Sequence, residues 1–341
     1  MTDEPRKVQE FIMGYLQNYY KMLGEQKYKV YQFKDYFAYS LKGNYTFIKE
    51  EFLLKAQIEH YKQQSVNLTF QRPVLHPAWK YIGGSDRACD VRVGLDMELQ
   101  YKGIPAKTIL KNLEHQFVLV KEGREWRIEE DTYEYEFDLA GPYGLELRGR
   151  RQKKKKWEFS QSREIRAIPK GIYSREKAVE YARKYALVPN TKEWKNYEAY
   201  GGDCTNFVSQ CLFAGGIPFD HQGKYVTHKW YWYSDQYRTP SFTSADALKT
   251  YMLNNEGFGL VAQLGDMQSM KLGDIVQLGD LKETTHSMLV VGIVKEDGET
   301  PLTKDLLIAQ HSGVDGIRGF NIPLATKPNQ RVYYNILGYN P

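Results

Sequence analysis

The chain has 341 residues, of which 42% are hydrophobic and 26% charged, a composition typical of globular protein and long enough for about two domains. The formal net charge is +5, but residues 148–156 (RGRRQKKKK) alone carry seven positive charges and no negative ones. The rest of the chain is close to neutral, which argues against specific nucleic-acid binding. Three cysteines are too few for a disulfide framework.

The N-terminal residues carry no targeting signal that we can identify. The segment before Tyr15 contains Asp3, Glu4 and Glu10 and lacks the apolar core of a secretory signal peptide. We also find no stretch of residues apolar enough to be a transmembrane segment. We therefore expect the protein to be either cytoplasmic or exported with its leader removed.

Residues 1–147 have the pattern of a small α+β domain. Amphipathic spacing predicts helices over residues 6–24 and 46–63, and strict alternation of apolar and polar residues predicts a strand over 89–101. A hairpin that turns near Gly123 follows. Helices followed by long antiparallel strands favour a cystatin-like or nuclear-transport-factor-like fold. This part shows no nucleophile constellation, and we interpret its histidines as structural: His60, His76 and His115.

The basic run belongs to a linker over residues 148–168. Such runs are usually solvated, and the alternative is attraction to an anionic polymer such as a wall polymer, a membrane surface or nucleic acid. A second domain over 169–341 places its helices before a meander of strands, which predicts an α+β fold rather than a doubly wound sheet. Its helices are expected to start near Ser174, Cys204 and residue 243. Its expected strands are 271–279, 285–298, 305–312 and 331–339.

The run GGDCTNFVSQCLFAGG, residues 201–216, places a cysteine at the start of a short amphipathic helix. Asp203 is a good N-cap residue, and Cys204 next to it meets the positive end of the helix dipole, which favours the nucleophilic thiolate. Cys211 falls in the apolar stripe and is expected to be core. Glycine at 216 can close the helix. The two thiols lie about 10 Å apart along the helix, beyond the ~7 Å limit for a disulfide.

A nucleophilic cysteine needs a base, and the base needs an orienting partner. His286 stands at the start of one expected strand and His311 at the end of the next. If these strands are antiparallel neighbours, the two positions meet. Gln310 points to the opposite face from His311, so only one of these two residues can orient His286.

A helix-borne cysteine, a strand-borne histidine and a polar residue on the following strand form the papain-like order. Residues 173–339 resemble the putative amidase domain of Gram-positive bacteria, a branch of the papain-like cell-wall hydrolases of the NlpC and CHAP types. The longest and most specific match is the run around the cysteine. The matching segments are YSREKAVEYA at 173–182, GGDCTNFVSQ at 201–210, LGDIVQ at 272–277, HSMLV at 286–290 and QHS at 310–312.

This resemblance implies a role for each residue of the constellation. Cys204 attacks a carbonyl carbon, and His286 takes the thiol proton and later protonates the leaving amine. His311 orients the imidazole, with Gln310 and Asp315 as alternatives. The resemblance implies neither a cofactor nor a metal, and it makes a peptide, most plausibly a peptidoglycan stem peptide, the substrate.

Three further features of this half carry weaker signals. The backbone N–H at the start of the cysteine helix is the natural first oxyanion donor, and the side chain of Tyr197 is a candidate second donor. Trp230 and Trp232 share one face of an alternating stretch, and they are either buried or form a wall of the substrate groove. His221 and His228 have no acid or cysteine nearby and make a poor metal site.

The leading hypothesis is therefore a cysteine amidohydrolase that works through a thioester. One alternative is an acyltransferase or peptidase with the same chemistry and a non-wall substrate, and transfer of the acyl group to an amine would favour it. The other is a non-catalytic binding module that keeps the fold. A thiol that is alkylated no faster than a free small thiol would favour the binding module.

Overall fold

The structure is a computed structural model that describes four stretches of the chain, 4–133, 168–254, 258–312 and 316–341. The basic run at 148–156 and Asp315 fall outside these stretches, so the expectations attached to them stay predictions. Within the described stretches, no helix combines the length and the apolar character needed to cross a membrane.

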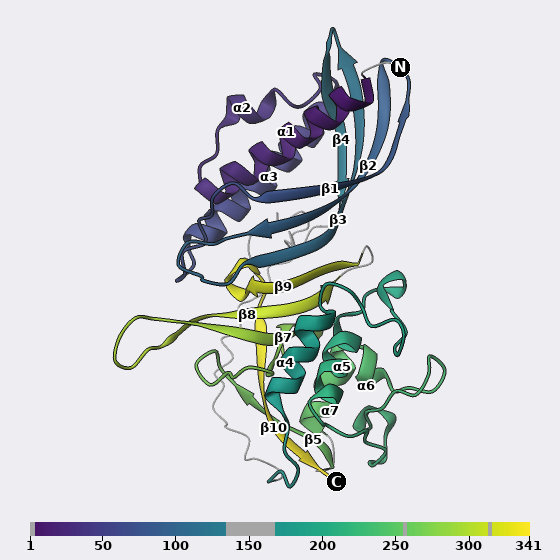
Figure 1. Cartoon of the computed structure of the whole chain (residues 1–341), viewed down its shortest axis with the longest axis vertical. Coiled ribbons are helices and arrows are strands. Elements are labelled where there is room, and N and C mark those ends of the chain that lie inside the picture. Colours follow the sequence, from purple (N-terminus) through teal and green to yellow (C-terminus); the bar gives the residue numbers. More distant parts are fainter. Residues whose placement is uncertain (1–3, 134–167, 255–257, 313–315) are drawn as a thin grey trace. The chain divides into compact units, whose positions relative to one another are not determined.

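The chain separates into two compact units (Figure 1). The first comprises Met1–Phe137 and Asn321–Lys327, and the second comprises Asp138–Phe320 and Pro328–Pro341. The first unit thus includes a short segment from late in the sequence, which the boundaries expected from the sequence do not contain. Both units combine helices with antiparallel strands, so the expected α+β class is confirmed.

In the first unit, two long helices pack against an antiparallel sheet (Figure 1). Helix α1 (Glu4–Glu25) and helix α3 (Leu41–Lys62) match the two expected helices, and the short α2 (Val30–Lys34) lies between them in sequence. The strands run in the order β1–β2–β3, and β4 also pairs with β3. Their bounds are β1 Val74–Gly84, β2 Ala88–Leu99, β3 Thr108–Glu122 and β4 Glu125–Tyr133.

The alternating stretch predicted as a strand forms β2, with its apolar side chains buried. The predicted hairpin joins β3 to β4, and Gly123 takes a φ of 64°, a left-handed conformation that glycine adopts without strain. Trp126 and Ile128 of β4 are buried. The finer likeness to a cystatin-like or nuclear-transport-factor-like fold stays a prediction.

Hydrogen bonds attach the late segment to the rest of the first unit, and two of them are buried or partly buried. Thr108 donates from Oγ1 to the carbonyl oxygen of Asn321 at 2.8 Å. His60 Nε2 lies 2.8 Å from the carbonyl oxygen of Ala325. His60 is buried, and this contact fits the structural role expected for it.

The second unit begins with the helices that carry and support the cysteine run at residues 201–216. Helix α4 (Arg175–Tyr185) starts as predicted at Ser174, whose Oγ accepts from the N–H of Lys177. Helix α5 (Cys204–Ala214) packs against α4 and against two strands of the sheet. The remaining helices are α6 Pro240–Thr243 and α7 Ala245–Asn254, with 3₁₀ turns η1 Glu198–Tyr200, η2 Val226–His228 and η3 Leu324–Thr326.

The sheet of the second unit follows the order β9–β8–β7–β6–β10–β5. The four expected strands are present as β6, β7, β8 and β10, while β5 and β9 were not expected. Strand β9 includes Gly319 and Asn321, and Asn321 has a φ of 55°, so its alternation is hard to read. The bounds are β5 Gly259–Gly265, β6 Ile275–Gly279, β7 Thr284–Lys295, β8 Thr303–Ser312, β9 Ile317–Pro323 and β10 Arg331–Asn340.

Candidate active site

Cys204 is the first residue of α5 and is half-buried. One helix face is fully buried and includes Phe207 and Leu212. Cys211 lies on this face with no exposed area, which confirms it as a core residue. Gly216 has a φ of 93°, the left-handed conformation expected just beyond the helix end.

Asp203 occupies the N-cap position of α5 as predicted, but its side chain makes no capping hydrogen bond to the helix backbone, so that part of the prediction is wrong. Its Oδ1 accepts from the backbone N–H of Tyr197 at 3.0 Å and from the side-chain amide of Asn206 at 2.8 Å. Its Oδ2 accepts from Nδ1 of His311 at 2.8 Å. The carboxylate is therefore used to hold the loop before Cys204 against β8, because a tertiary partner outcompetes the local cap.

The expected neighbouring strands do pair, and β7 runs antiparallel to β8. Val290 lies opposite Ile308 in this register, so His286 and Gln310 fall on one face of the sheet and His311 on the other. His286 donates from Nε2 to Oε1 of Gln310 at 3.1 Å, and the Gln310 side chain is fully buried. Gln310 thus occupies the position of the orienting partner.

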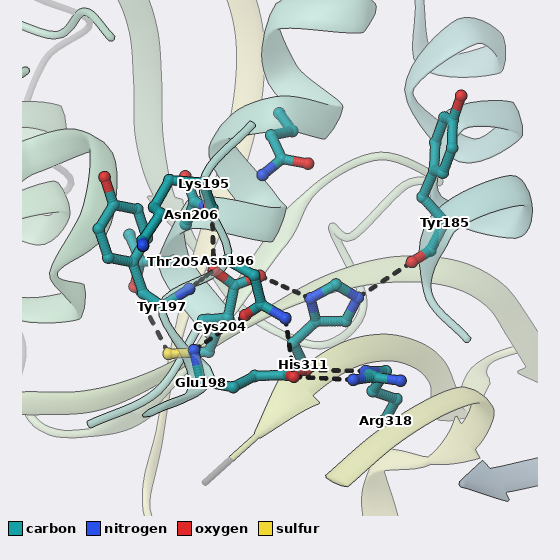
Figure 2. A network of polar contacts seen from close by, with 12 residues as sticks. Tyr185, Lys195, Asn196, Tyr197, Glu198, Cys204, Thr205, Asn206, His311 and Arg318 are labelled. Atoms are coloured by element: carbon teal, nitrogen blue, oxygen red, sulfur yellow. Dashed lines mark hydrogen bonds and ion pairs between the residues drawn. The ribbon is translucent and has the colours of Figure 1, made fainter. Parts of the chain in front are cut away.

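The assignment of His311 as the partner of His286 is wrong, because the strand turns its side chain to the other face. Its Nδ1 donates to Asp203, and its Nε2 donates to the carbonyl oxygen of Tyr185 at 3.0 Å (Figure 2). Both ring nitrogens are therefore engaged by oxygen atoms of the segments that flank the site. The ring also stacks on Phe207 with centroids 4.2 Å apart, and His311 is 1% exposed. Its role is to fix the cysteine loop.

The imidazole of His286 lies close enough to the thiol of Cys204 to affect the pKa of that thiol. Burial alone raises the pKa of this thiol, but the charge and hydrogen bond of His286 lower it. The backbone N–H of Ser287 and the hydroxyl of Thr205 lower it further, and the resulting pKa is about 7. An amide oxygen can only accept, so Gln310 keeps the proton on Nε2 and leaves Nδ1 of His286 to serve the thiol.

A buried chain of polar groups ties the first turn of α5 to β7. The hydroxyls of Thr205 and Ser287 lie 2.9 Å apart, and the side-chain amide of Gln277 donates to Ser287 Oγ at 2.9 Å. All three side chains are fully buried. Because Ser287 follows His286 directly, these bonds fix the distance between the helix that carries the thiol and the strand that carries the imidazole.

The loop before Cys204 is also held by an ion pair that no sequence pattern indicates. Glu198 accepts from Arg318 through two bonds of 2.7 Å, and from the side-chain amide of Asn196 at 2.8 Å (Figure 2). Burial raises the pKa of Glu198, but the Arg318 and Asn196 bonds outweigh it, so this pKa lies below its usual range. Glu198 and Arg318 are 120 positions apart, and no local pattern links them.

Tyr197 is not available as a second oxyanion donor. Its hydroxyl accepts from Nε1 of Trp232 at 3.0 Å and from Nε of Arg238 at 2.8 Å. It donates its own proton toward Asp235. These bonds instead connect the aromatic stretch that contains Trp232 to the loop that leads into the cysteine helix.

The aromatic stretch divides into a buried and a surface part. Trp230 is fully buried and donates to Ser209 at 3.2 Å, as expected for a core residue. Four rings outside the core form what we call the aromatic cluster. Ring centroids in this cluster lie 4.5 to 6.0 Å apart, and its members are His221, Tyr231, Tyr233 and Tyr237.

The two histidines of this region are engaged with tyrosines. His221 Nε2 lies 3.0 Å from the hydroxyl of Tyr233, and the His228 ring packs edge-on against Tyr225 at 5.2 Å. In the part of the chain that the structure describes, no group of three histidine, cysteine or acidic side chains is arranged to hold a metal ion.

Comparison with known families finds a match for the C-terminal half of the chain. Residues 172–334 match the family described as "Putative amidase domain". The matched range contains Cys204, His286 and Gln310, the three residues of the candidate site. It agrees with the resemblance inferred from the cysteine run.

Two relatives come from Bacillus subtilis, and both are described as uncharacterized. YjcM is 38% identical over 104 residues, which cover 30% of this chain and 22% of YjcM. YhbB is 27% identical over 130 residues, which cover 38% of this chain and 40% of YhbB. The matches therefore span well under half of either relative.

One solved structure is also similar, and its title describes a putative scytalone dehydratase from Novosphingobium aromaticivorans. It shares 15% identity and a TM-score of 0.26, and the match covers 38% of this chain and 82% of that chain. A likeness of this size carries no argument about function.

Proposed function

We propose that residues 172–334, which belong to the putative amidase domain family, hydrolyse an amide bond through a thioester on Cys204. One observation carries this proposal: Cys204 stands at the start of α5 beside the imidazole of His286, which is held by Gln310, and this imidazole lowers the pKa of the thiol to about 7. A free cysteine thiol ionises near pH ~8.5. The match to this family supports amidase activity. The arrangement of the Cys204 thiol, the His286 imidazole and the Gln310 amide supports Cys204 as the nucleophile and His286 as the base.

The first half of the reaction forms the thioester. Nδ1 of His286 takes the proton from Cys204, and the sulfur attacks the carbonyl carbon of the substrate while the carbonyl π electrons move to oxygen. The backbone N–H of Cys204 is one of the unpaired donors at a helix start, and it stabilises this oxyanion. The oxyanion then collapses and the C–N bond breaks, and His286 returns its proton to the leaving amine.

The second half releases the acid. Water enters, loses a proton to His286 and attacks the thioester carbon. The C–S bond breaks, and Cys204 leaves as the thiolate that starts the next cycle. Throughout both halves Gln310 keeps Nε2 in place. A neutral amide stabilises the imidazolium less than a carboxylate does, which limits how far the ion pair is favoured.

The proposed substrate is a peptide stem of peptidoglycan. The match of the cysteine run to cell-wall hydrolases supports this choice. The aromatic cluster supports it as well, because exposed tyrosine rings can stack on sugar rings or on a peptide stem. Trp232 and Tyr197 connect that stretch to the loop before Cys204. The basic run at 148–156 adds attraction to an anionic wall polymer.

The test is digestion of purified peptidoglycan, with the fragments identified by mass spectrometry. The protein is expected to release fragments that gain one water at a single type of amide bond. Cys204→Ala should release none, and Cys211→Ala, the matched control on the same helix, should release them normally. Release by the Cys204→Ala protein, or no release by the unaltered protein, would contradict the proposal. Products in which an added amine replaces water would indicate an acyltransferase.

A further inference from the structure

The first unit contains a cavity that the proposed amidase chemistry does not use. It has a volume of about 110 Å³, and all its lining residues belong to this unit. They come from α1, α3, three strands of the sheet and the segment Asn321–Lys327. This cavity is smaller than the cavity of about 150 Å³ that holds one benzene ring in another protein, so it admits nothing larger than a molecule with a single small ring.

The lining is mostly apolar and aromatic. Six of the lining residues are tyrosines and six are leucine or isoleucine, including Leu16, Leu110 and Leu113. Tyrosine rings pack well against a flat aromatic ligand in offset or edge-on contacts. An apolar cavity with few polar groups is the common form of a small-molecule site.

One of these few polar groups is His115, which is 5% exposed. Its Nδ1 lies 3.0 Å from Oδ1 of Asp131, and Tyr15 donates to Oδ2 of the same carboxylate at 3.4 Å. A carboxylate only accepts, so Nδ1 carries the hydrogen and Nε2 presents a lone pair. Among the residues that the structure describes, Nε2 of His115 has no hydrogen-bond partner.

A second buried carboxyl lies behind this pair. Glu50 is fully buried, and it accepts from the hydroxyl of Tyr133 at 2.7 Å. The Tyr133 ring lies 4.4 Å from the ring of His115. Burial raises the pKa of Glu50, and the charge of Asp131 raises it further. Burying such a network costs stability, and groups of this kind in a cavity are typical of functional sites.

We propose that this cavity binds a small single-ring phenol, whose ring packs among the tyrosines and whose hydroxyl donates to Nε2 of His115. The proposal adds ligand binding to the structural role expected for His115 from the sequence. The proposed site is separate from Cys204, so it does not depend on the amidase proposal.

The first test compares phenol with anisole by isothermal titration of the full chain. Anisole keeps the ring but replaces the hydroxyl with a methyl ether, so it cannot donate to His115. Phenol should bind about three- to tenfold more tightly than anisole, the range expected for one net hydrogen bond. Equal affinities, or no binding of phenol at millimolar concentration, would overturn the proposal. This comparison requires no mutation.

Variants then locate the binding. Leu113→Trp fills the cavity and should abolish phenol binding, whereas Leu41→Trp, at a position in α3 that is 91% exposed, should not change it. His115→Phe should reduce the affinity for phenol to that for anisole. Cys204→Ala should leave phenol binding intact, which separates this site from the amidase site. Unchanged phenol binding by the Leu113→Trp protein would place the ligand elsewhere and overturn the proposal.

Discussion

Two thiols on one helix have pKa values shifted in opposite directions. Cys204 at the start of α5 meets an imidazole, and its pKa falls to about 7. Cys211, seven residues later, is fully buried in the core, and this burial raises the pKa of its thiol well above the usual value. The residue type and the helix are the same. The difference arises from the helix terminus and from the strand that faces it.

Two histidines on neighbouring strands show the same contrast. His286 is half-buried and is held by the neutral amide of Gln310, so one ring nitrogen is left for proton transfer. His311 is buried, and both of its ring nitrogens are used, by Asp203 and by a carbonyl oxygen. We propose that the first imidazole takes part in catalysis, whereas the contacts of the second hold a loop.

The largest expected effect tests the two thiols directly. Cys204→Ala should lower the rate of amide hydrolysis by at least about 10⁴-fold, the order of loss seen when a covalent nucleophile is removed. Cys211→Ala should keep most of the activity. Initial rates on peptidoglycan fragments measure both variants. Similar losses in the two variants would remove the distinction between the thiols.

The next effect concerns the partner of His286. Gln310→Ala frees the imidazole to rotate and should lower the rate by about 10- to 100-fold, the loss typical of a misplaced catalytic group. The fold should persist, as judged by circular dichroism. Gln236→Ala, at an exposed position, serves as the control. Full activity in the Gln310→Ala protein would show that the amide does not orient the base.

The Asp203–His311 pair should matter for stability. Breaking a buried ion pair by removing one partner costs about 3–5 kcal/mol. Asp203→Asn and His311→Asn should therefore both lower the free energy of unfolding measured in urea, and the double variant should cost less than their sum. If His311→Asn abolished activity without any loss of stability, the structural role given to His311 would be refuted.

The smallest effect concerns the hydroxyl chain under the site. Thr205→Val removes the bond to Ser287 and should cost about 1–3 kcal/mol of unfolding free energy, because Ser287 loses a buried partner. It should also raise the pKa of Cys204, since the Thr205 hydroxyl lowers it. Urea unfolding and thiol titration check the two effects. If Thr205→Val changed neither the free energy of unfolding nor the pKa of Cys204, the hydroxyl chain would contribute neither to stability nor to the state of the thiol.

The sequence was sufficient to predict the residues whose signals are local. The apolar spacing after Cys204 predicted α5, and the position of His286 at a strand start placed it beside the next strand. The choice between Gln310 and His311 depended on strand register, which becomes known only when Val290 is seen opposite Ile308.

Other contacts could not be predicted because they join distant segments. Asp203 has the residue type of an N-cap, yet His311 binds its carboxylate from 108 positions away. Glu198 and Arg318 are farther apart still. Local propensity describes which bonds a residue forms with its sequence neighbours. In the folded chain, side chains from distant segments can take those bonds instead, as His311 does with Asp203.

The most direct measurement is the rate at which iodoacetamide alkylates Cys204 as a function of pH, followed by mass spectrometry of the labelled peptide. Because the pKa lies below that of a free thiol, the thiolate predominates above pH 7 and the rate should fall as the pH drops through about 7. In His286→Ala the midpoint should move upward, since the imidazole that lowers this pKa is gone. A midpoint like that of a free thiol in both proteins would contradict the pairing of Cys204 with His286.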